Sequence, residues 1–169
     1  MTTLSLRTVR LRSGEQFRDV REVELEPLEL GGQRYVPVPE RPEAELKITR
    51  LSSGFLFELR LEVRMHGPCM RCLDDAVAPV RVSAREYQAT SPGGSEELTT
   101  PYLEQDRLDL SAWARDVVAL SLPERILCKA DCAGLCPSCG ADLNRGACAC
   151  PPSEPDSRWS KLAELRDRL

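Results

Sequence analysis

The stretch FLFELRLEVRM, residues 55–65, carries an apolar side chain at every odd position and a charged one at four of its five even positions. A period of two residues is typical of a strand that buries one face and exposes the other. A second alternating run follows from Val77 to Tyr87, and turn-forming Gly67 and Pro68 lie between the two runs. The two runs therefore predict an antiparallel hairpin within a larger sheet.

Other segments alternate less regularly, at residues 4–12, 20–25 and 44–49. Pro37 falls in a further apolar segment and restricts it to a sheet edge or an irregular strand. Several strands joined by short connections, with few helices, favour the α+β class over a doubly wound sheet. The strands therefore predict a mainly antiparallel sheet or a small open barrel.

Two helices are expected. An apolar stripe predicts the first over residues 110–121, with Asp109 or Ser111 as its N-cap. The second lies near the C-terminus and is capped by Asp156. Its apolar stripe consists of Trp159, Leu162, Ala163 and Leu165. We expect this second helix to pack on the sheet.

Cysteine spacing is the clearest chemical signal in the chain. Six of the eight cysteines lie in residues 128–150, CKADCAGLCPSCGADLNRGACAC. Within it Cys136 and Cys139 have the spacing of a metal knuckle, and Gly140 suits the left-handed backbone that follows. Four thiolates in two close pairs make a closed tetrahedral zinc site of a structural kind. Residues 128–150 therefore predict a zinc-binding lobe.

Three other interpretations of these cysteines remain open. Disulfides need an oxidising compartment, and residues 1–17 lack the apolar core of a secretory signal. Iron–sulfur ligation also uses four thiolates, but ferredoxin runs have different spacings. Free buried cysteines occur singly in cores, whereas six crowded into a loop rich in glycine and proline do not fit a core. Zinc is the interpretation that the spacing favours.

The remaining pair, Cys69 and Cys72, lies at the predicted hairpin tip. A C-x-x-C pair is also a redox motif, but the strand–loop–helix setting of that motif is absent here. We therefore predict two zinc ions. The first set of ligands is Cys69, Cys72, Cys128 and Cys132, and the second is Cys136, Cys139, Cys148 and Cys150. A rival grouping joins Cys128, Cys132, Cys136 and Cys139 around one ion.

Length and charge set further limits. The 169 residues suit one domain, with the zinc-binding lobe inside it. No apolar run approaches the roughly 20 residues that cross a bilayer, so we expect no membrane contact and a cytoplasmic protein. The net charge is −4, so the chain has no overall basic field. The oligomeric state is left open by the sequence.

Catalysis finds little support in the residues. His66 is the one histidine of the chain. Because it lies at the end of a predicted strand, we expect it to be a half-exposed strand residue. The alternative is a role as a metal ligand or a pH switch. No phosphate loop, HExxH or GxSxG motif occurs. We therefore expect that the protein is not an enzyme.

Several arginines could make phosphate contacts if the fold brings their strands to one face. The chain has eight aromatic residues, so few aromatic side chains are available to stack on bases. The candidates for RNA contact are Arg60, Arg64, Arg71, Arg81 and Arg85.

The motifs together resemble one family. Cys69-Met-Arg-Cys72-Leu73, the helix that ends at Leu122-Pro123, the run CKADCAGLCPSCGADLN and the terminal Arg158-Trp159 look like the YceD family, in this order and over nearly the whole chain. Its members are called large ribosomal RNA subunit accumulation proteins, a bacterial and plastid group.

The resemblance implies a non-catalytic role in the synthesis, processing or stability of large-subunit ribosomal RNA. Its implied partners are that RNA or a precursor particle, with ribosome assembly proteins as further partners. The alternative function is a zinc-stabilised protein–protein adaptor that presents Leu135, Pro137 and Leu143 and affects RNA indirectly.

Overall fold

The structure is a computed structural model that describes residues 1–91 and 98–151. It divides into two compact units, residues 1–132 and 133–169, which we call the first and second unit and describe separately. That the chain is a single domain over residues 1–169 stays a prediction.

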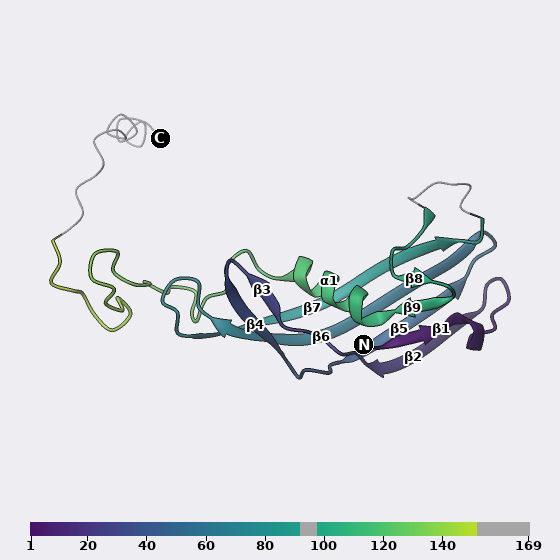
Figure 1. The fold of residues 1–169 in the computed structure, drawn as a ribbon, viewed down its shortest axis with the longest axis horizontal. Coiled ribbons are helices and arrows are strands. Elements are labelled where there is room, and N and C mark those ends of the chain that lie inside the picture. Colours follow the sequence, from purple (N-terminus) through teal and green to yellow (C-terminus); the bar gives the residue numbers. More distant parts are fainter. Residues whose placement is uncertain (92–97, 152–169) are drawn as a thin grey trace, which may run out of the picture. The chain divides into compact units, whose positions relative to one another are not determined.

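A long hairpin forms the centre of the first unit (Figure 1). Strands β6 (Gly54–Pro68) and β7 (Asp75–Ala89) pair antiparallel along their whole length, from Gly54 opposite Ala89 to Pro68 opposite Asp75. The hairpin predicted from residues 55–65 is confirmed, and both strands are longer than their alternating cores. Its tip loop carries Cys69 and Cys72 and begins next to the Tyr35 side chain, whose hydroxyl donates to the Pro68 carbonyl.

The other edge of β6 is shared by two strands. Strand β5 (Glu43–Arg50) pairs with the first half of β6, and β4 (Gln33–Val38) pairs with the second half. Strand β2 (Gln16–Glu22) adds to β5, and β3 (Leu28–Leu30) adds to β4. All pairs are antiparallel, so the result is an antiparallel six-stranded sheet, as expected for the sheet-dominated class.

A smaller sheet joins the beginning of the chain to the start of the helix. Its order is β1-β9-β8, formed by β1 (Thr3–Ser5), β8 (Leu103–Glu104) and β9 (Arg107–Asp109). The short 3-10 helix η1 (Leu6–Thr8) follows β1. Pairing of residues about a hundred positions apart ties the N-terminal segment to the rest of the unit.

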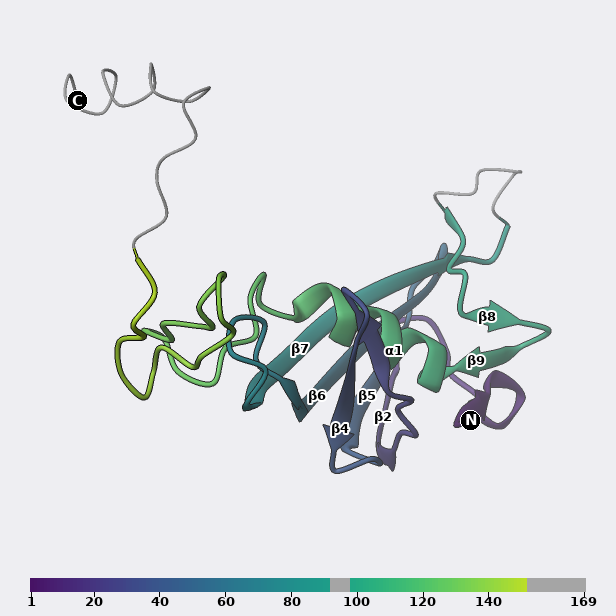
Figure 2. The same ribbon diagram turned by 60° about the vertical axis from the view of Figure 1, so that its left-hand side comes forward.

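Helix α1 (Leu110–Ser121) begins and ends where the sequence predicted. The Asp109 side chain caps it by accepting a hydrogen bond from the Ala112 backbone N–H at 3.0 Å. Its buried residues are Leu110, Trp113, Ala114 and Val118. The helix packs against β7 (Figure 2), so its apolar stripe is covered by the sheet.

The two-helix prediction is wrong for the part of the chain that the structure describes, where α1 is the one α-helix. The second predicted helix falls on residues 156–165, outside the described residues. An apolar stripe indicates where a helix could bury a face, but a short helix depends on the tertiary contacts that cover the stripe. The class remains α+β, with two antiparallel sheets and one described helix. None of the described helices is long and apolar enough to cross a membrane.

Alternation gives the hairpin two distinct faces. The buried face of β6 holds Phe57, Leu59, Leu61, Val63 and Met65. On β7, the same face of the sheet holds Ala76, Ala78, Val80 and Val82. The opposite side of the six-stranded sheet is exposed, and we call it the outer face. Most of its side chains are charged, as a solvated sheet face requires.

Candidate functional site

The structure brings all eight cysteines together in two groups of four. Within each group the sulfur atoms lie within 4.8 Å of one another. The groups are the first and second sets that the sequence paired, whereas the rival grouping of Cys128 and Cys132 with Cys136 and Cys139 does not form. The first set belongs wholly to the first unit and the second set to the second unit.

Two segments build the first set. The hairpin tip contributes Cys69 and Cys72, and the segment after α1 contributes Cys128 and Cys132. In the tip, the Cys69 backbone N–H donates to the Asp74 carbonyl at 2.7 Å and the Leu73 N–H donates to the Cys69 carbonyl at 3.0 Å. These bonds close a tight turn that points both sulfurs the same way.

A backbone hydrogen bond joins the two segments. The Met70 N–H donates to the carbonyl of Ile126 at 2.9 Å, and the Ile126 side chain is 2% exposed. The segment after α1 is therefore joined to the hairpin tip by a backbone hydrogen bond, and its Ile126 side chain is buried. This anchoring places the first set independently of the sulfur atoms themselves.

The first set fits a single metal ion. The sulfurs of Cys69 and Cys132 are 3.8 Å apart, and those of Cys72 and Cys128 are 3.5 Å apart. Sulfurs at about 2.3 Å from a tetrahedral zinc ion are separated by about 3.8 Å. Four cysteines and no other donor would close the coordination sphere, so such a site leaves no position for a substrate.

Ionisation is shared unequally among the thiols of the first set. Burial raises the pKa of Cys69, but backbone N–H donors from Arg71, Cys72 and Cys128 outweigh it and lower this pKa to about 6. The Asp74 N–H lowers the pKa of Cys72, but burial and the neighbouring thiols raise it to about 12. Four adjacent thiolates repel one another, and a divalent cation is the charge that lets them ionise together.

The second set lies in a loop of the second unit. The Gly140 N–H donates to the Cys136 carbonyl at 2.8 Å, and Gly140 has a φ of 72°, which a glycine tolerates. Backbone N–H groups of Cys139 and Ser138 and the Cys148 thiol lower the pKa of Cys136 to about 6. The predicted metal knuckle thus has the expected turn.

Neighbouring thiols have the largest effect on the pKa of Cys150, the last member of the second set. The Cys139 thiol, burial and the other two thiols raise the pKa of Cys150 to about 12. The second set therefore repeats the pattern of the first, with one thiol that ionises readily and one held protonated by its neighbours. Each set of four cysteines could therefore hold a metal ion.

Four of the five predicted RNA-contact arginines share the outer face. Arg60 and Arg64 lie on β6, and Arg81 and Arg85 lie on β7. Arg71 lies apart from them, exposed in the hairpin tip. The structure therefore supplies the shared face that the sequence could only suppose.

Two of these four arginines form ion pairs with glutamates on the outer face, and the other two form none in the part of the chain that the structure describes. Arg81 Nε pairs with Glu62 at 3.0 Å, and Arg85 Nε pairs with Glu58 at 3.2 Å. Within the described residues, Arg60 and Arg64 make no ion pair. Of these four arginines, Arg60 and Arg64 are therefore the two without a paired carboxylate within residues 1–91 and 98–151, although Lys47 and, to a smaller extent, the charges of Arg85 and Arg60 lower the pKa of Glu58.

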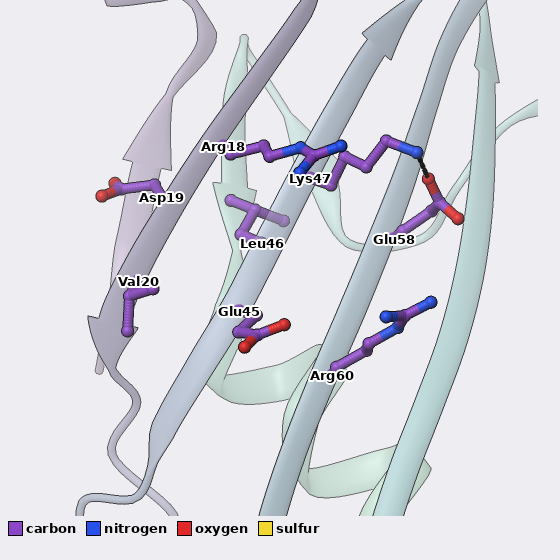
Figure 3. A pocket seen from close by; sticks show the side chains of 8 residues that line it. All are labelled: Arg18, Asp19, Val20, Glu45, Leu46, Lys47, Glu58 and Arg60. Carbon is purple, nitrogen blue, oxygen red and sulfur yellow. Dashed lines mark ion pairs between the residues drawn. The ribbon is translucent and has the colours of Figure 1, made fainter.

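A shallow cavity of about 540 Å³ opens on the outer face across β2, β5 and β6 (Figure 3). Arg18, Lys47 and Arg60 line it together with acidic side chains, and Lys47 Nζ pairs with Glu58 at 2.6 Å. The sequence offered Arg18 as one of several arginines that could share a face with Arg60, but it did not indicate Lys47. The alternation of each strand predicts which side chains point outward, but only the strand register makes Arg18 a partner of Lys47.

His66 lies outside both cysteine sets. It is on β6 between Val36 and Val77 of the neighbouring strands, and its Nε2 is enclosed without a hydrogen-bond partner among the described residues. The alternative role of His66 as a ligand in these sets therefore finds no support in the geometry.

The sheet and the two cysteine sets define a class: a small α+β protein with a cysteine cluster at the tip of its central hairpin. The chain matches the family described as large ribosomal RNA subunit accumulation protein YceD over residues 57–166. The match covers more than half of the chain and includes the hairpin from Phe57 onward, α1 and all eight cysteines. The chain belongs to this family.

Relatives of the chain come from bacteria and plants. An uncharacterised protein of Mycobacterium tuberculosis is 31% identical over 134 residues, which cover 73% of this chain and 61% of that protein. An uncharacterised protein of Mycobacterium leprae is 27% identical over 130 residues, 72% of this chain and 57% of that protein.

The chloroplastic large ribosomal RNA subunit accumulation protein YCED homolog 1 of Arabidopsis thaliana is 35% identical over 66 residues, 39% of this chain and 21% of that protein. The chain spans about three fifths of the length of the mycobacterial relatives. No solved structure matches the chain significantly.

Proposed function

We propose that this protein is a non-catalytic, zinc-stabilised cytoplasmic factor that supports the accumulation of large-subunit ribosomal RNA. It would act on precursor RNA or on an assembling particle. The family match over residues 57–166 carries this proposal. The closed cysteine sets support the non-catalytic part, because four thiolates around one ion leave no site for a substrate or a reactive water.

Zinc is the ion that the cysteine sets favour. Soft thiolate ligands in a tetrahedron suit zinc and iron–sulfur clusters. A cluster places several irons and sulfides between its ligands, so it needs wider spacing than the 3.8 Å and 3.5 Å observed in the first set. Two sets of four cysteines therefore support two zinc ions per chain.

RNA contact is proposed at the outer face through phosphate groups. Arg60 and Arg64 lack a paired carboxylate within the described strands, and Arg81 and Arg85 extend the basic row where an incoming phosphate competes with their carboxylates. Phosphate contacts fix position and carry no sequence information directly. Arg71 at the hairpin tip would add a contact from a different part of the surface.

In-cell crosslinking followed by RNA sequencing tests this function. We expect enrichment of large-subunit ribosomal RNA for the wild type and its loss for the double variant Arg60→Glu, Arg64→Glu. The matched control is Arg10→Glu with Arg41→Glu, which makes the same change in net charge at exposed positions outside the strands of the six-stranded sheet. The control should crosslink like the wild type.

A binding titration with large-subunit RNA adds a quantitative readout. Each lost phosphate contact lowers the slope of log affinity against log salt by about 0.7 to 0.9. We therefore expect the outer-face double variant to lose a slope of about 1.5, and the control to keep the wild-type slope. Equal binding by both variants would remove the outer face from the proposal.

The adaptor function has one observation in its favour. Met70 and Leu73 in the hairpin tip are 41% and 58% exposed, beside Cys69 and Cys72. Exposed apolar side chains of this size suit a protein partner. Crosslinks to protein alone, with normal ribosomal RNA levels after depletion of the protein, would favour the adaptor and contradict the ribosomal role.

A further inference from the structure

The two cysteine sets differ in how far they are covered. Three members of the first set are buried, and Cys69 and Cys132 have no exposed surface, while Cys128 is exposed. In the second set Cys136 alone is buried, and Cys139 is exposed. A small dissolved oxidant therefore reaches most of the second set directly, but most of the first set only after local opening.

The first set also has a framework that does not depend on its sulfurs. Fifteen residues on each strand of the β6–β7 hairpin hold Cys69 and Cys72. On the other side, the Met70 to Ile126 hydrogen bond and the buried Ile126 side chain hold the segment after α1. Loss of one ligand would leave this backbone in place.

The second set has no comparable support in the described residues 133–151. They contain no helix or strand beyond an isolated bridge between Leu135 and Asp142. Cys136 is their one buried apolar residue. Hydrogen bonds such as that from the Leu143 N–H to the Gly134 carbonyl order the turns, but these described residues bury little apolar surface to offset the entropy of ordering the chain. The fold of this segment therefore depends on the ion that joins the four sulfurs.

We propose that the second set is the oxidation site of this protein. A peroxide converts its four thiolates to two disulfides, the zinc ion leaves, and residues 133–151 lose their ordered turns while the first set stays intact. This inference rests on the proposed zinc binding and gives the two sites different roles. The first is structural, and the second responds to oxidants.

Each disulfide forms in two balanced steps. A thiolate sulfur attacks one oxygen of hydrogen peroxide, the O–O bond breaks, and hydroxide leaves behind a sulfenic acid. A second thiolate attacks that sulfur, the S–S bond forms, and a second hydroxide leaves. Two protons from solvent convert both hydroxides to water. Two peroxides thus accept the four electrons of four thiolates, and zinc is released because no anionic ligand remains.

The positions of the sulfurs decide which disulfides are expected. All four lie within 4.8 Å, so pairing needs only small movements. Cys148 and Cys150 are separated by one residue, which makes a direct bond between them strained. The expected disulfides therefore connect Cys136 and Cys139 with Cys148 and Cys150.

The test uses the full chain, purified without chelator and with its zinc content measured first. Hydrogen peroxide is added while a chromogenic chelator reports released zinc. Alkylation before and after reduction, followed by mass spectrometry, maps the oxidised cysteines. We expect one zinc to leave after about two peroxides, at least about tenfold faster than the other, with disulfides confined to the second set.

Two variants assign the phases. Cys148→Ser with Cys150→Ser should carry one zinc and lack the fast release. Cys69→Ser with Cys72→Ser should keep the fast release, and if this variant does not fold, the cysteine map of the wild type decides alone. Oxidation of the first set at the same or lower peroxide would overturn the inference.

The failure of the inference differs from the failure of the metal assignment. Two zinc ions that both resist peroxide would overturn the oxidation site and leave zinc binding standing. A chain that carries no zinc when purified would refute zinc binding, and the inference would fall with it.

Discussion

Gly67 shows how closely a single residue near the hairpin tip is constrained. A Cβ added there would lie 2.8 Å from the Arg34 carbonyl oxygen and 2.8 Å from Cε1 of Tyr35. The Tyr35 ring is fully buried, and its hydroxyl donates to the Pro68 carbonyl at 2.9 Å, so it has no room to yield. The ring therefore requires a glycine opposite it.

We predict that Gly67→Ala lowers the free energy of unfolding by about 1–3 kcal/mol, through overpacking against Tyr35. Urea denaturation measures this. The comparison is Gly14→Ala, where no atom lies within 4 Å and the cost of about 1 kcal/mol comes from the positive φ alone. A Gly67→Ala protein as stable as the wild type would show that the ring shifts freely.

Cysteine spacing predicted the members of both sets, because a two-residue gap within a tight turn points two sulfurs one way. Pairing Cys69 and Cys72 with Cys128 and Cys132 followed from the reach of a hairpin tip. The exposure of Cys139 against the burial of Cys132 could not be predicted, since both sit in similar loops. It depends on how the rest of the chain packs around each loop, which the spacing of cysteines does not encode.

At the scale of the element, α1 depends on its first turn. Its N-cap Asp109 has an extended backbone, and its carboxylate accepts from the Ala112 N–H. We predict that Asp109→Ala costs about 1 kcal/mol of stability, because the first-turn N–H loses its acceptor. Urea denaturation compares it with Asp109→Asn, which keeps an acceptor oxygen and should cost much less. Equal losses in both variants would assign the effect to charge instead of the hydrogen bond.

The elements that the sequence predicted best are those with local signals. Alternation in residues 55–65 and 77–87 predicted β6 and β7, and an apolar stripe with its cap at Asp109 predicted α1. The sharing of one β6 edge by β4 and β5 could not be predicted, because it depends on pairing between distant segments. The same holds for the pairing of Thr3 with Asp109. Arg18 joined the outer face only through such a distant register.

The whole molecule combines a net charge of −4 with a mixed outer face. Glu58 takes part in ion pairs with both Lys47 and Arg85, so much of the positive charge there is neutralised. Long-range attraction of RNA to the chain as a whole is therefore weak, and contact depends on short-range pairing with Arg60 and Arg64. Because few phosphates would be contacted, we expect a shallow slope of log affinity against log salt, with about 1.5 of it coming from these two arginines.

Removal of the metal should affect the two units differently. Structural zinc contributes about 10–16 kcal/mol in isolated peptides, and the described part of the second unit has no core to replace it. We predict that excess chelator abolishes hydrogen-exchange protection in residues 133–151, while the amides shared by β6 and β7 stay protected by their own ladder.

Returning zinc should restore protection in residues 133–151, and returning magnesium should not, because a hard cation binds thiolates poorly. Protection that survives complete removal of zinc would mean that the turn at Gly140 and its hydrogen bonds fold without an ion. The metal would then fill a preformed site, and its removal would leave the fold of these residues unchanged.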